Sequence, residues 1–332
     1  MQSRQTLPGR QTAAYRILEF VALSGEFPTD RLSRLPGGEA YKAHVIQSLK
    51  QKHLLRTFYK DGLRGYRLTA KAKGLLTADR PERFLPYLAG AAETNHIKSE
   101  PARRQRLHRI AETAAAMQNA GAAIFPDEKP EVFSPVWNGC PQLFITAPAF
   151  YNSREIKELG TEAVKIKGAR SAGVLLTESA AFVVYNLGGS LMKWQYRAEM
   201  RTKALMQTIL CRERLPEQYA PEDVKGLLFG DNMELAAAIL SGDGGKQYLL
   251  LDGSYEHFYY LTNDRRGEKL LRMMCSAELS EELEALLLTD LWEKDEGLPI
   301  ENDAIDGSGR PVLFAYTCDL PRIKRFDTAL RL

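Results

Sequence analysis

The feature that most restricts the fold is a short run in which two β-type segments flank a tight basic turn. Residues 53–76 read HLLRTFYKDGLRGYRLTAKAKGLL, where RTFY and GYRLT surround KDGLR and a helix-like AKAKGLL follows. An Asp-Gly pair between such segments favours a hairpin, because Gly62 readily takes a positive φ. The pattern therefore predicts a hairpin with Lys60 and Arg64 at its tip, a shape that can lie along a nucleic-acid backbone.

Helical segments precede this hairpin. Residues 14–26 space their apolar side chains as a helix does, and residues 28–38 predict a short helix with Thr29 as its N-cap. Residues 39–55 (EAYKAHVIQSLKQKHLL) predict a third helix. Its buried face is expected to consist of Val45, Ile46 and Leu49. Helix, short helix, helix and basic hairpin is the order of a winged helix-turn-helix.

Charge is distributed unevenly along the chain. Residues 1–80 carry 15 Lys/Arg against 6 Asp/Glu, a balance of +9. Residues 81–120 carry 6 against 4, and residues 121–332 carry 24 against 32, a balance of −8. A basic head on an acidic body indicates that the head would hold any polyanion.

The organisation changes after the hairpin. We expect a DNA-binding domain over residues 1–80, a connector with a linking helix over 81–125, and an α/β domain over 126–332. Short runs rich in Val, Phe, Tyr and Leu alternate with helical stretches in the third segment, which favours a mixed sheet covered by helices. The expected strands lie at 142–150, 172–177, 181–187, 226–230, 247–253, 258–262 and 311–317.

Two resemblances follow from these residues. The stretch VIQSLKQKHLLRTFYKDGLRGYRLTAKAKGLL (residues 45–76) resembles the third helix and wing of MarR-type winged-helix DNA-binding domains, with His53 at a position usually held by Gly. The same head followed by a nuclease-like α/β domain is similar to the replication-relaxation family, encoded on plasmids and integrative conjugative elements of Gram-positive bacteria. The resemblance implies an accessory protein of mobile-element replication or conjugation.

The resemblance also implies a PD-(D/E)XK nuclease-like fold for the second domain. Such a site needs an Asp on one strand and an acidic-x-Lys on the next, so that two carboxylates hold Mg²⁺. The matching segment, AGVLLTESAAFVVYNLGG, has no Asp on its first strand, and Glu178 lies at that strand's end. Val184–Leu187 stands where the acidic-x-Lys belongs. We therefore expect a nuclease-like domain without a working site.

The expected DNA contacts lie on the third helix and the hairpin. Side chains of the helix would meet base edges in the major groove, and cations on and after the hairpin would meet phosphates. The candidates on the helix are Tyr41, Lys42, His44, Gln47, Ser48 and Lys52. The candidates on and after the hairpin are Arg56, Lys60, Arg64, Arg67 and Lys71. The basic run at 102–112 (ARRQRLHRIAE) is either a second phosphate contact or the charged face of a solvated helix.

Two other functions remain open. One is a metal-dependent endonuclease that uses Glu178 or Glu199 in displaced positions. The other is a transcription regulator whose second domain binds a ligand in an apolar pocket lined by the aromatics of FVVYN (182–186) or HFYYLT (257–262).

The sequence also bears on cofactors, location and partners. No two histidines are spaced to share a metal on a helix, and the four cysteines lack a CxxC pair, so we expect no metal, cofactor or disulfide framework. The absence of a signal-like or membrane-spanning run favours the cytoplasm. Double-stranded DNA is the expected partner, while the resemblance implies contact with relaxase or replication proteins, or a homodimer.

Overall fold

The structure is a computed structural model that describes residues 6–331 apart from 135–142, 158–168, 295–296 and 298–299. The chain forms two compact units. Met1–Gln118 and Ile124–Lys129 make up the first, and Asn119–Ala123 and Pro130–Leu332 make up the second. Both contain helices and β-sheet, which confirms the mixed α and β class. Within the described ranges, no helix has the length and apolar character needed to cross a membrane.

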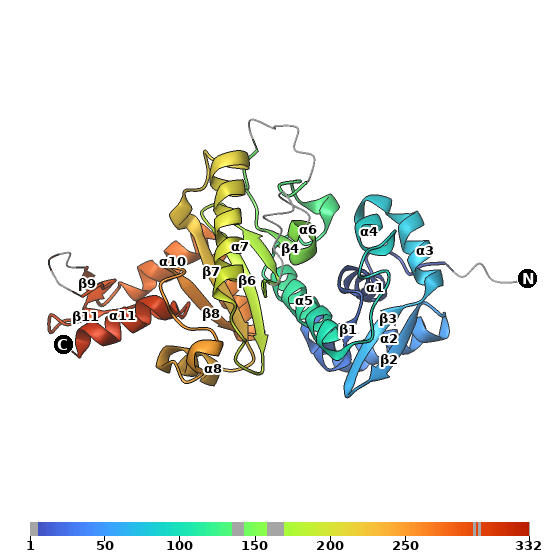
Figure 1. The fold of residues 1–332 in the computed structure, drawn as a ribbon, viewed down its shortest axis with the longest axis horizontal. Helices are drawn as coiled ribbons and strands as arrows, with labels where there is room; N and C mark the ends of the chain where they lie inside the picture. Colours follow the sequence, from blue (N-terminus) through green and yellow to red (C-terminus); the bar gives the residue numbers. More distant parts are fainter. Residues whose placement is uncertain (1–5, 135–142, 158–168, 295–296, 298–299, 332) are drawn as a thin grey trace, which may run out of the picture. The chain divides into compact units, whose positions relative to one another are not determined.

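The first unit combines helices with a three-stranded antiparallel sheet of order β1-β3-β2 (Figure 1). Its elements are α1 (Ala13–Ser24), β1 (Phe27–Pro28), the 3-10 helix η1 (Thr29–Arg34), α2 (Glu39–Gln51), β2 (Leu55–Lys60), β3 (Leu63–Leu68), α3 (Ala70–Asp79), α4 (Pro81–Leu88), α5 (Pro101–Asn119) and the 3-10 turn η2 (Pro126–Glu128). The predicted order of helix, short helix, helix and hairpin is confirmed.

The hairpin turns more tightly than the sequence suggested. Lys60 pairs with Leu63, so only Asp61 and Gly62 form the loop. Both have positive φ, 51° for Asp61 and 75° for Gly62, as a two-residue type I′ turn requires. This turn sets the register of every residue pair along the two strands.

The apolar face predicted for the third helix is confirmed, because Val45, Ile46 and Leu49 of α2 are all buried. The predicted N-cap of the short helix is wrong. Pro28 occupies that position, and Thr29 is the first residue of η1. The Thr29 hydroxyl instead donates to the carbonyl of Arg64 at 3.4 Å, which ties η1 to the hairpin.

Helix α2 ends in a left-handed residue that is not glycine. His53 has φ 52°, and the amide of Leu54 donates to the carbonyl of Leu49 at 2.9 Å. This is the geometry of a Schellman-type helix end, in which glycine usually fills the left-handed position.

Replacing His53 by Gly is expected to raise the free energy of unfolding by about 0.5–1 kcal/mol. The left-handed conformation costs a residue with a Cβ about 1–2 kcal/mol, and the extra freedom of an unfolded glycine offsets part of that gain. The matched control is His44→Gly in the exposed middle of α2, which should destabilise the unit by about 1 kcal/mol. Urea unfolding followed by circular dichroism measures both. Destabilisation by both changes would show that the His53 side chain contributes a contact.

The second unit is built on a five-stranded mixed sheet of order β4-β5-β6-β7-β8. Its strands are β4 (Ala149–Asn152), β5 (Gly173–Leu176), β6 (Ala181–Gly188), β7 (Val224–Gly230) and β8 (Phe258–Thr262). The first three pair antiparallel, and β6, β7 and β8 pair parallel. Residues 181–187 of β6 are all buried, as expected for a central strand covered on both faces.

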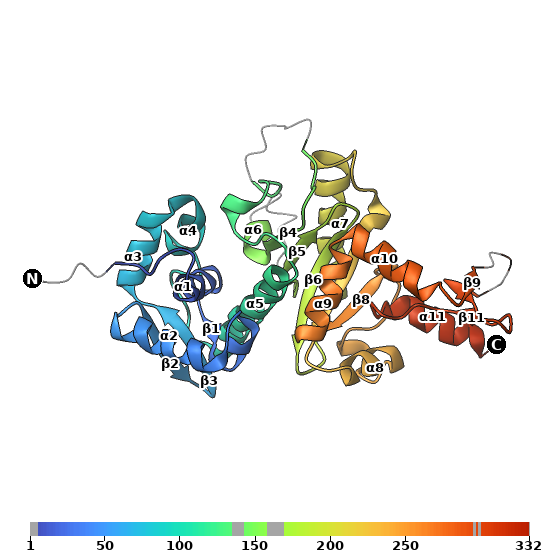
Figure 2. The ribbon, with the colours of Figure 1, turned by 180° about the vertical axis from the view of Figure 1, so that it is seen from behind.

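Helices cover both faces of this sheet. Figures 1 and 2 show α7 on one face and α9 and α10 on the other. The helical elements are α6 (Ser153–Lys157), α7 (Tyr196–Thr208) with its π-helical extension η3 (Ile209–Arg214), η4 (Pro221–Asp223), α8 (Glu234–Ser241), η5 (Gly245–Gln247), α9 (Arg265–Met274), α10 (Ala277–Leu287) and α11 (Leu320–Leu330). A small antiparallel sheet adds β9 (Trp292–Glu293), β10 (Ala304–Ile305) and β11 (Pro311–Val312).

Three predicted strands of the second unit are wrong over most of their length. Residues 247–253 form only one bridge, between Tyr248 and Lys193, and the run predicted at 311–317 is a strand only over Pro311–Val312. The run predicted at 142–150 begins outside the described residues and is a strand only from Ala149, where β4 starts. In the first case Leu249 is buried in the core without a neighbouring strand. The apolar run at 247–253 therefore indicates burial in the core and not pairing with another strand.

Candidate nucleic-acid interface

Helix α2 presents a polar face to solvent. Tyr41, His44 and Gln47 are exposed, Ser48 is half-buried, and Lys52 is exposed at the helix end. Gly38 precedes the helix at its N-cap, and the buried residues lie on the opposite side. Five of the six side chains predicted on this helix therefore share one accessible surface.

Two predicted contact residues are buried and leave the candidate interface. Lys42 lies three residues before Val45, on the buried side of α2, and its Nζ donates to the carbonyl of Leu35 at 2.9 Å. Arg67 is 3% exposed, and its Nε donates to Oε2 of Glu26 at 2.7 Å. Both charged groups are bonded inside the unit.

The hairpin has two chemically different faces. Tyr59 pairs with Arg64 and Arg56 pairs with Arg67, and side chains alternate along each strand. We call the side toward α2 the front face and the other side the back face. The front face carries Thr57, Tyr59, Arg64 and Tyr66. The back face carries Arg56, Phe58, Lys60 and Arg67.

Exposed cations remain on both faces. Arg56, Lys60 and Arg64 are exposed, and so is Lys71 in the first turn of α3. Within the described ranges, none of the four forms an ion pair. Lys73 differs, because its Nζ donates to both oxygens of Asn95, and burial lowers its pKa. The four exposed cations are thus available to phosphates.

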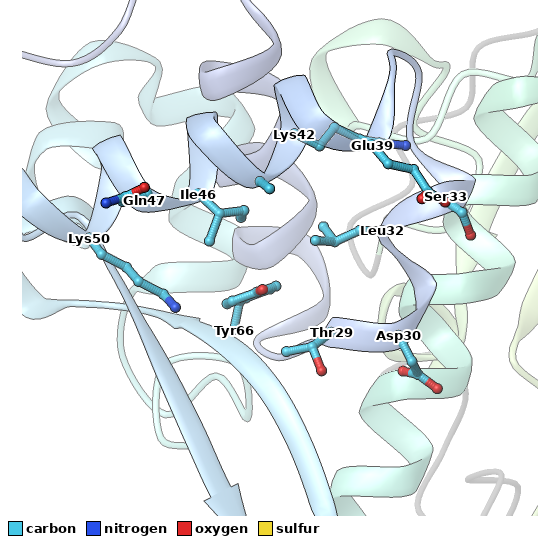
Figure 3. Close-up of a pocket in the computed structure, with 11 residues that line it drawn as sticks. Thr29, Asp30, Leu32, Ser33, Glu39, Lys42, Ile46, Gln47, Lys50 and Tyr66 are labelled. Carbon is cyan, nitrogen blue, oxygen red and sulfur yellow. The ribbon is translucent and has the colours of Figure 1, made fainter.

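A pocket of about 460 Å³ opens between η1, α2 and β3. Figure 3 shows Tyr66 beneath α2, Lys50 and Gln47 toward one end, and Asp30 and Glu39 toward the other. The Lys50 ammonium lies over the Tyr66 ring, 5.2 Å from its centre. This contact places the front face of the hairpin beside the accessible surface of α2.

Sequence reasoning missed two residues on this surface. Lys50 connects α2 to Tyr66, and Tyr59 is 70% exposed directly opposite Arg64. Strand alternation would have placed Tyr59 on the side of Arg64 had the turn been assigned as two residues. An exposed aromatic ring beside an arginine is suited to packing against a sugar or a base.

A buried charge cluster lies behind the hairpin. The carboxylate of Glu26 is completely buried, and it accepts hydrogen bonds from Arg67, Arg104 and His108. Arg104 Nη2 lies 2.6 Å and His108 Nε2 lies 2.9 Å from Glu26 Oε1. Burial alone would raise the pKa of Glu26, but these hydrogen bonds outweigh it and lower the pKa to about 2.

Arg104 also holds the backbone next to the hairpin turn. Its Nη1 donates to the carbonyl of Lys60 at 2.7 Å, and its Nη2 donates to the carbonyl of Leu63 at 3.0 Å. The Phe58 ring lies against both guanidiniums, 3.6 Å from Arg67 and 4.8 Å from Arg104. The basic run at 102–112 therefore includes a buried residue that fastens α5 to the hairpin, a role we did not expect.

One feature of the local sequence is explained by this cluster. Gly65 interrupts β3, and a Cβ there would come within 2.3 Å of Glu26 Oε1. A glycine inside a strand often marks such a close approach. The partners of Glu26 lie up to 82 residues away along the chain, so local patterns do not identify them.

A second buried charge network in this unit lies away from the hairpin. Arg83 is 3% exposed and pairs with Glu19, Asp127 and Glu128. Its guanidinium also lies 4.2 Å from the centre of the Phe125 ring. Residues 124–129 are thus held to the first unit by their contacts with Arg83 of α4.

In the second unit, the residues of the displaced nuclease site do not form a metal site. Glu178 is exposed between β5 and β6, whereas Glu199 on α7 is completely buried. Burial raises the pKa of Glu199 to about 7 against the opposing hydrogen bonds from the Arg170 amide and Tyr185. Among the described residues, no three His, Cys, Asp or Glu gather as metal ligands would.

A pocket of about 550 Å³ lies beside the first residues of β6, β7 and β8. Phe182, Tyr259 and His257 line it, so it draws on both aromatic runs that the sequence indicated. Its lining is more polar than expected. His257 Nδ1 lies 2.7 Å from Asp319 Oδ2, and Asp319 Oδ1 accepts from the Phe258 amide.

Comparisons of this chain with protein-family models, with curated proteins and with solved structures found no match.

Proposed function

We propose that the first unit is a winged helix that binds double-stranded DNA. The observation that carries the proposal is the accessible polar face of α2 beside a hairpin whose exposed cations are free of ion pairs within the described ranges. Helix α2 would enter the major groove and read base edges with Tyr41, His44 and Gln47. Lys52, Arg64 and Lys71 would contact phosphates and supply most of the affinity.

Changing Lys52, Arg64 and Lys71 together to Ala in the full chain tests this assignment. Each lost phosphate contact removes about 0.9 from the slope of log K against log salt, so the slope should flatten by about 2–3 units. Fluorescence anisotropy with labelled duplex DNA over a range of salt concentrations measures it. The matched control changes Lys193, Lys246 and Arg266, three exposed cations of the second unit, and should leave the slope nearly unchanged. An equal flattening of the salt slope in the two variants would contradict the assignment.

For the second unit we propose a nuclease-like fold that lacks a working site. The antiparallel β4-β5-β6 meander followed by α7 and a parallel β7 supports the fold. The buried apolar run in β6 and the buried carboxyl of Glu199 support the proposal that this unit has lost metal-dependent nuclease activity.

Pure protein is therefore expected to leave supercoiled plasmid intact in the presence of Mg²⁺ or Mn²⁺. The physical reason is that no pair of exposed carboxylates at the β5–β6 hairpin is in place to hold the metal. Agarose electrophoresis detects nicking, with Glu199→Gln and Glu178→Gln as paired variants. Cleavage that either change abolishes would establish the endonuclease alternative.

The biological role we propose rests on the sequence resemblance. It is that of a cytoplasmic accessory protein in replication or conjugation of a mobile element, with relaxase, replication proteins or a second copy as partners of the acidic unit. A ligand-responsive regulator is the second candidate, and the pocket beside His257 favours it.

A further inference from the structure

Helix α10 has an apolar face that the described residues of the unit cover only in part. Leu279, Leu283, Leu286 and Leu287 recur at the spacing of one helical face, a pattern that normally packs into a core. Yet none of the residues of α10 is fully buried. Leu279 and Leu283 are half-buried, Leu286 is 71% exposed and Leu287 is 36% exposed.

Further exposed apolar side chains follow the helix in sequence. Leu288 is 37% exposed, and Trp292 at the start of β9 is 70% exposed. Large exposed side chains grouped in this way mark interaction sites on soluble proteins, whereas scattered ones need no explanation.

The charges around this surface determine what can cover it. Residues 277–293 contain six Asp or Glu and no Lys or Arg. Glu278, Glu281, Glu282, Asp290 and Glu293 are exposed, and none forms an ion pair with another described residue. These carboxylates disfavour contact of the leucines with nucleic acid or an anionic membrane, although α9, which packs against α10, carries exposed Lys and Arg side chains. Two copies of α10 packed together would bring like charges into contact.

We propose that the α10 face, defined as Leu279, Leu283, Leu286 and Leu287, docks a basic amphipathic segment of a partner protein. Apolar side chains of that segment would cover the leucines, and flanking Lys or Arg would meet the unpaired carboxylates. The proposal stands apart from DNA binding, because it uses an acidic surface wholly within the second unit.

The test uses the full chain and two synthetic helical peptides with the same leucine pattern. One carries Lys at its polar positions and the other carries Glu. Fluorescence anisotropy of the labelled peptides should show binding of the lysine peptide only, weakening as salt rises. Leu286→Asp should weaken that binding at least tenfold, and Glu281→Gln with Glu282→Gln should reduce its dependence on salt.

Controls distinguish binding at this site from nonspecific hydrophobic binding. Met233→Asp removes another exposed apolar residue of the second unit and should leave the affinity unchanged. Circular dichroism verifies that the exposed substitutions leave folding intact. Equal binding of the glutamate peptide, or of the Leu286→Asp variant, would overturn the proposal. A dimer in analytical ultracentrifugation that Leu286→Asp dissociates would also overturn it, because a second copy would then cover the face.

Discussion

Replacing Glu26 by Gln is expected to lower the free energy of unfolding of the first unit by about 3–5 kcal/mol, because it leaves buried cations without a counter-charge. Arg67 and Arg104 are 3% and 0% exposed, so water cannot replace the lost carboxylate. Hydrogen exchange over the peptides of α1, α2 and the hairpin measures this unit separately from the second. Glu39→Gln, an exposed carboxylate at the start of α2, is the control and should change stability by less than about 0.5 kcal/mol.

The same cluster predicts an acid-sensitive first unit. The folded pKa of Glu26 is about 2, against an ordinary value of 4.5. A lowered carboxyl pKa stabilises the fold fully above the unfolded value, and that stabilisation is lost as the pH falls from about 4.5 to 2. This contribution to the free energy of unfolding is about 3 kcal/mol. In Glu26→Gln this component of the pH dependence should vanish. A variant that keeps the wild-type acid profile would show that another group dominates.

Arg104 connects this stability to the shape of the hairpin. Arg104→Lys keeps a positive charge near Glu26 but loses the planar fork that reaches the carbonyls of Lys60 and Leu63. We expect faster amide exchange around the turn and weaker DNA binding. A fragment that ends at residue 80 lacks Arg104 and His108, so it leaves Arg67 as the one remaining partner of Glu26 in the cluster.

Local sequence patterns predicted the helices and the hairpin of the first unit, because helical spacing and an Asp-Gly turn are properties of neighbouring residues. The position of Lys42 was predictable in the same way, since it falls on the face of Val45 and Ile46. Its long side chain and positive charge suggested a DNA contact, but the chain buries it against a carbonyl.

The burial of Arg67 was not predictable from local patterns. Its partner Glu26 is 41 residues away, and the helix that closes the cluster begins at Pro101. The sequence placed Lys60 and Arg64 alike at the tip of a five-residue turn. The two-residue turn shifts the register and separates them onto opposite faces. Residue types therefore predicted a basic wing, whereas tertiary contacts decide which of its cations lie beside α2.

Cations on the two faces of the hairpin should therefore contribute differently to DNA binding. Arg64→Ala should weaken binding to all duplexes alike and flatten the salt slope by about 1, because Arg64 lies on the front face beside α2. Arg56→Ala removes the same charge from the back face and should change the slope by much less. Gln47→Ala should instead reduce the difference in binding free energy between specific and random duplexes, by about 1–3 kcal/mol if Gln47 reads a base.

Salt titrations of the three variants against one specific and one random duplex separate these effects. Wild-type folding of Arg64→Ala and Arg56→Ala is expected, since exposed single charges change stability by less than about 0.5 kcal/mol. A larger loss of slope from Arg56→Ala than from Arg64→Ala would mean that DNA meets the back face, on the side of α5. Unchanged affinity in all three variants would mean that the hairpin faces a protein, because phosphate contacts cannot be removed from a DNA-binding wing without a change in the slope.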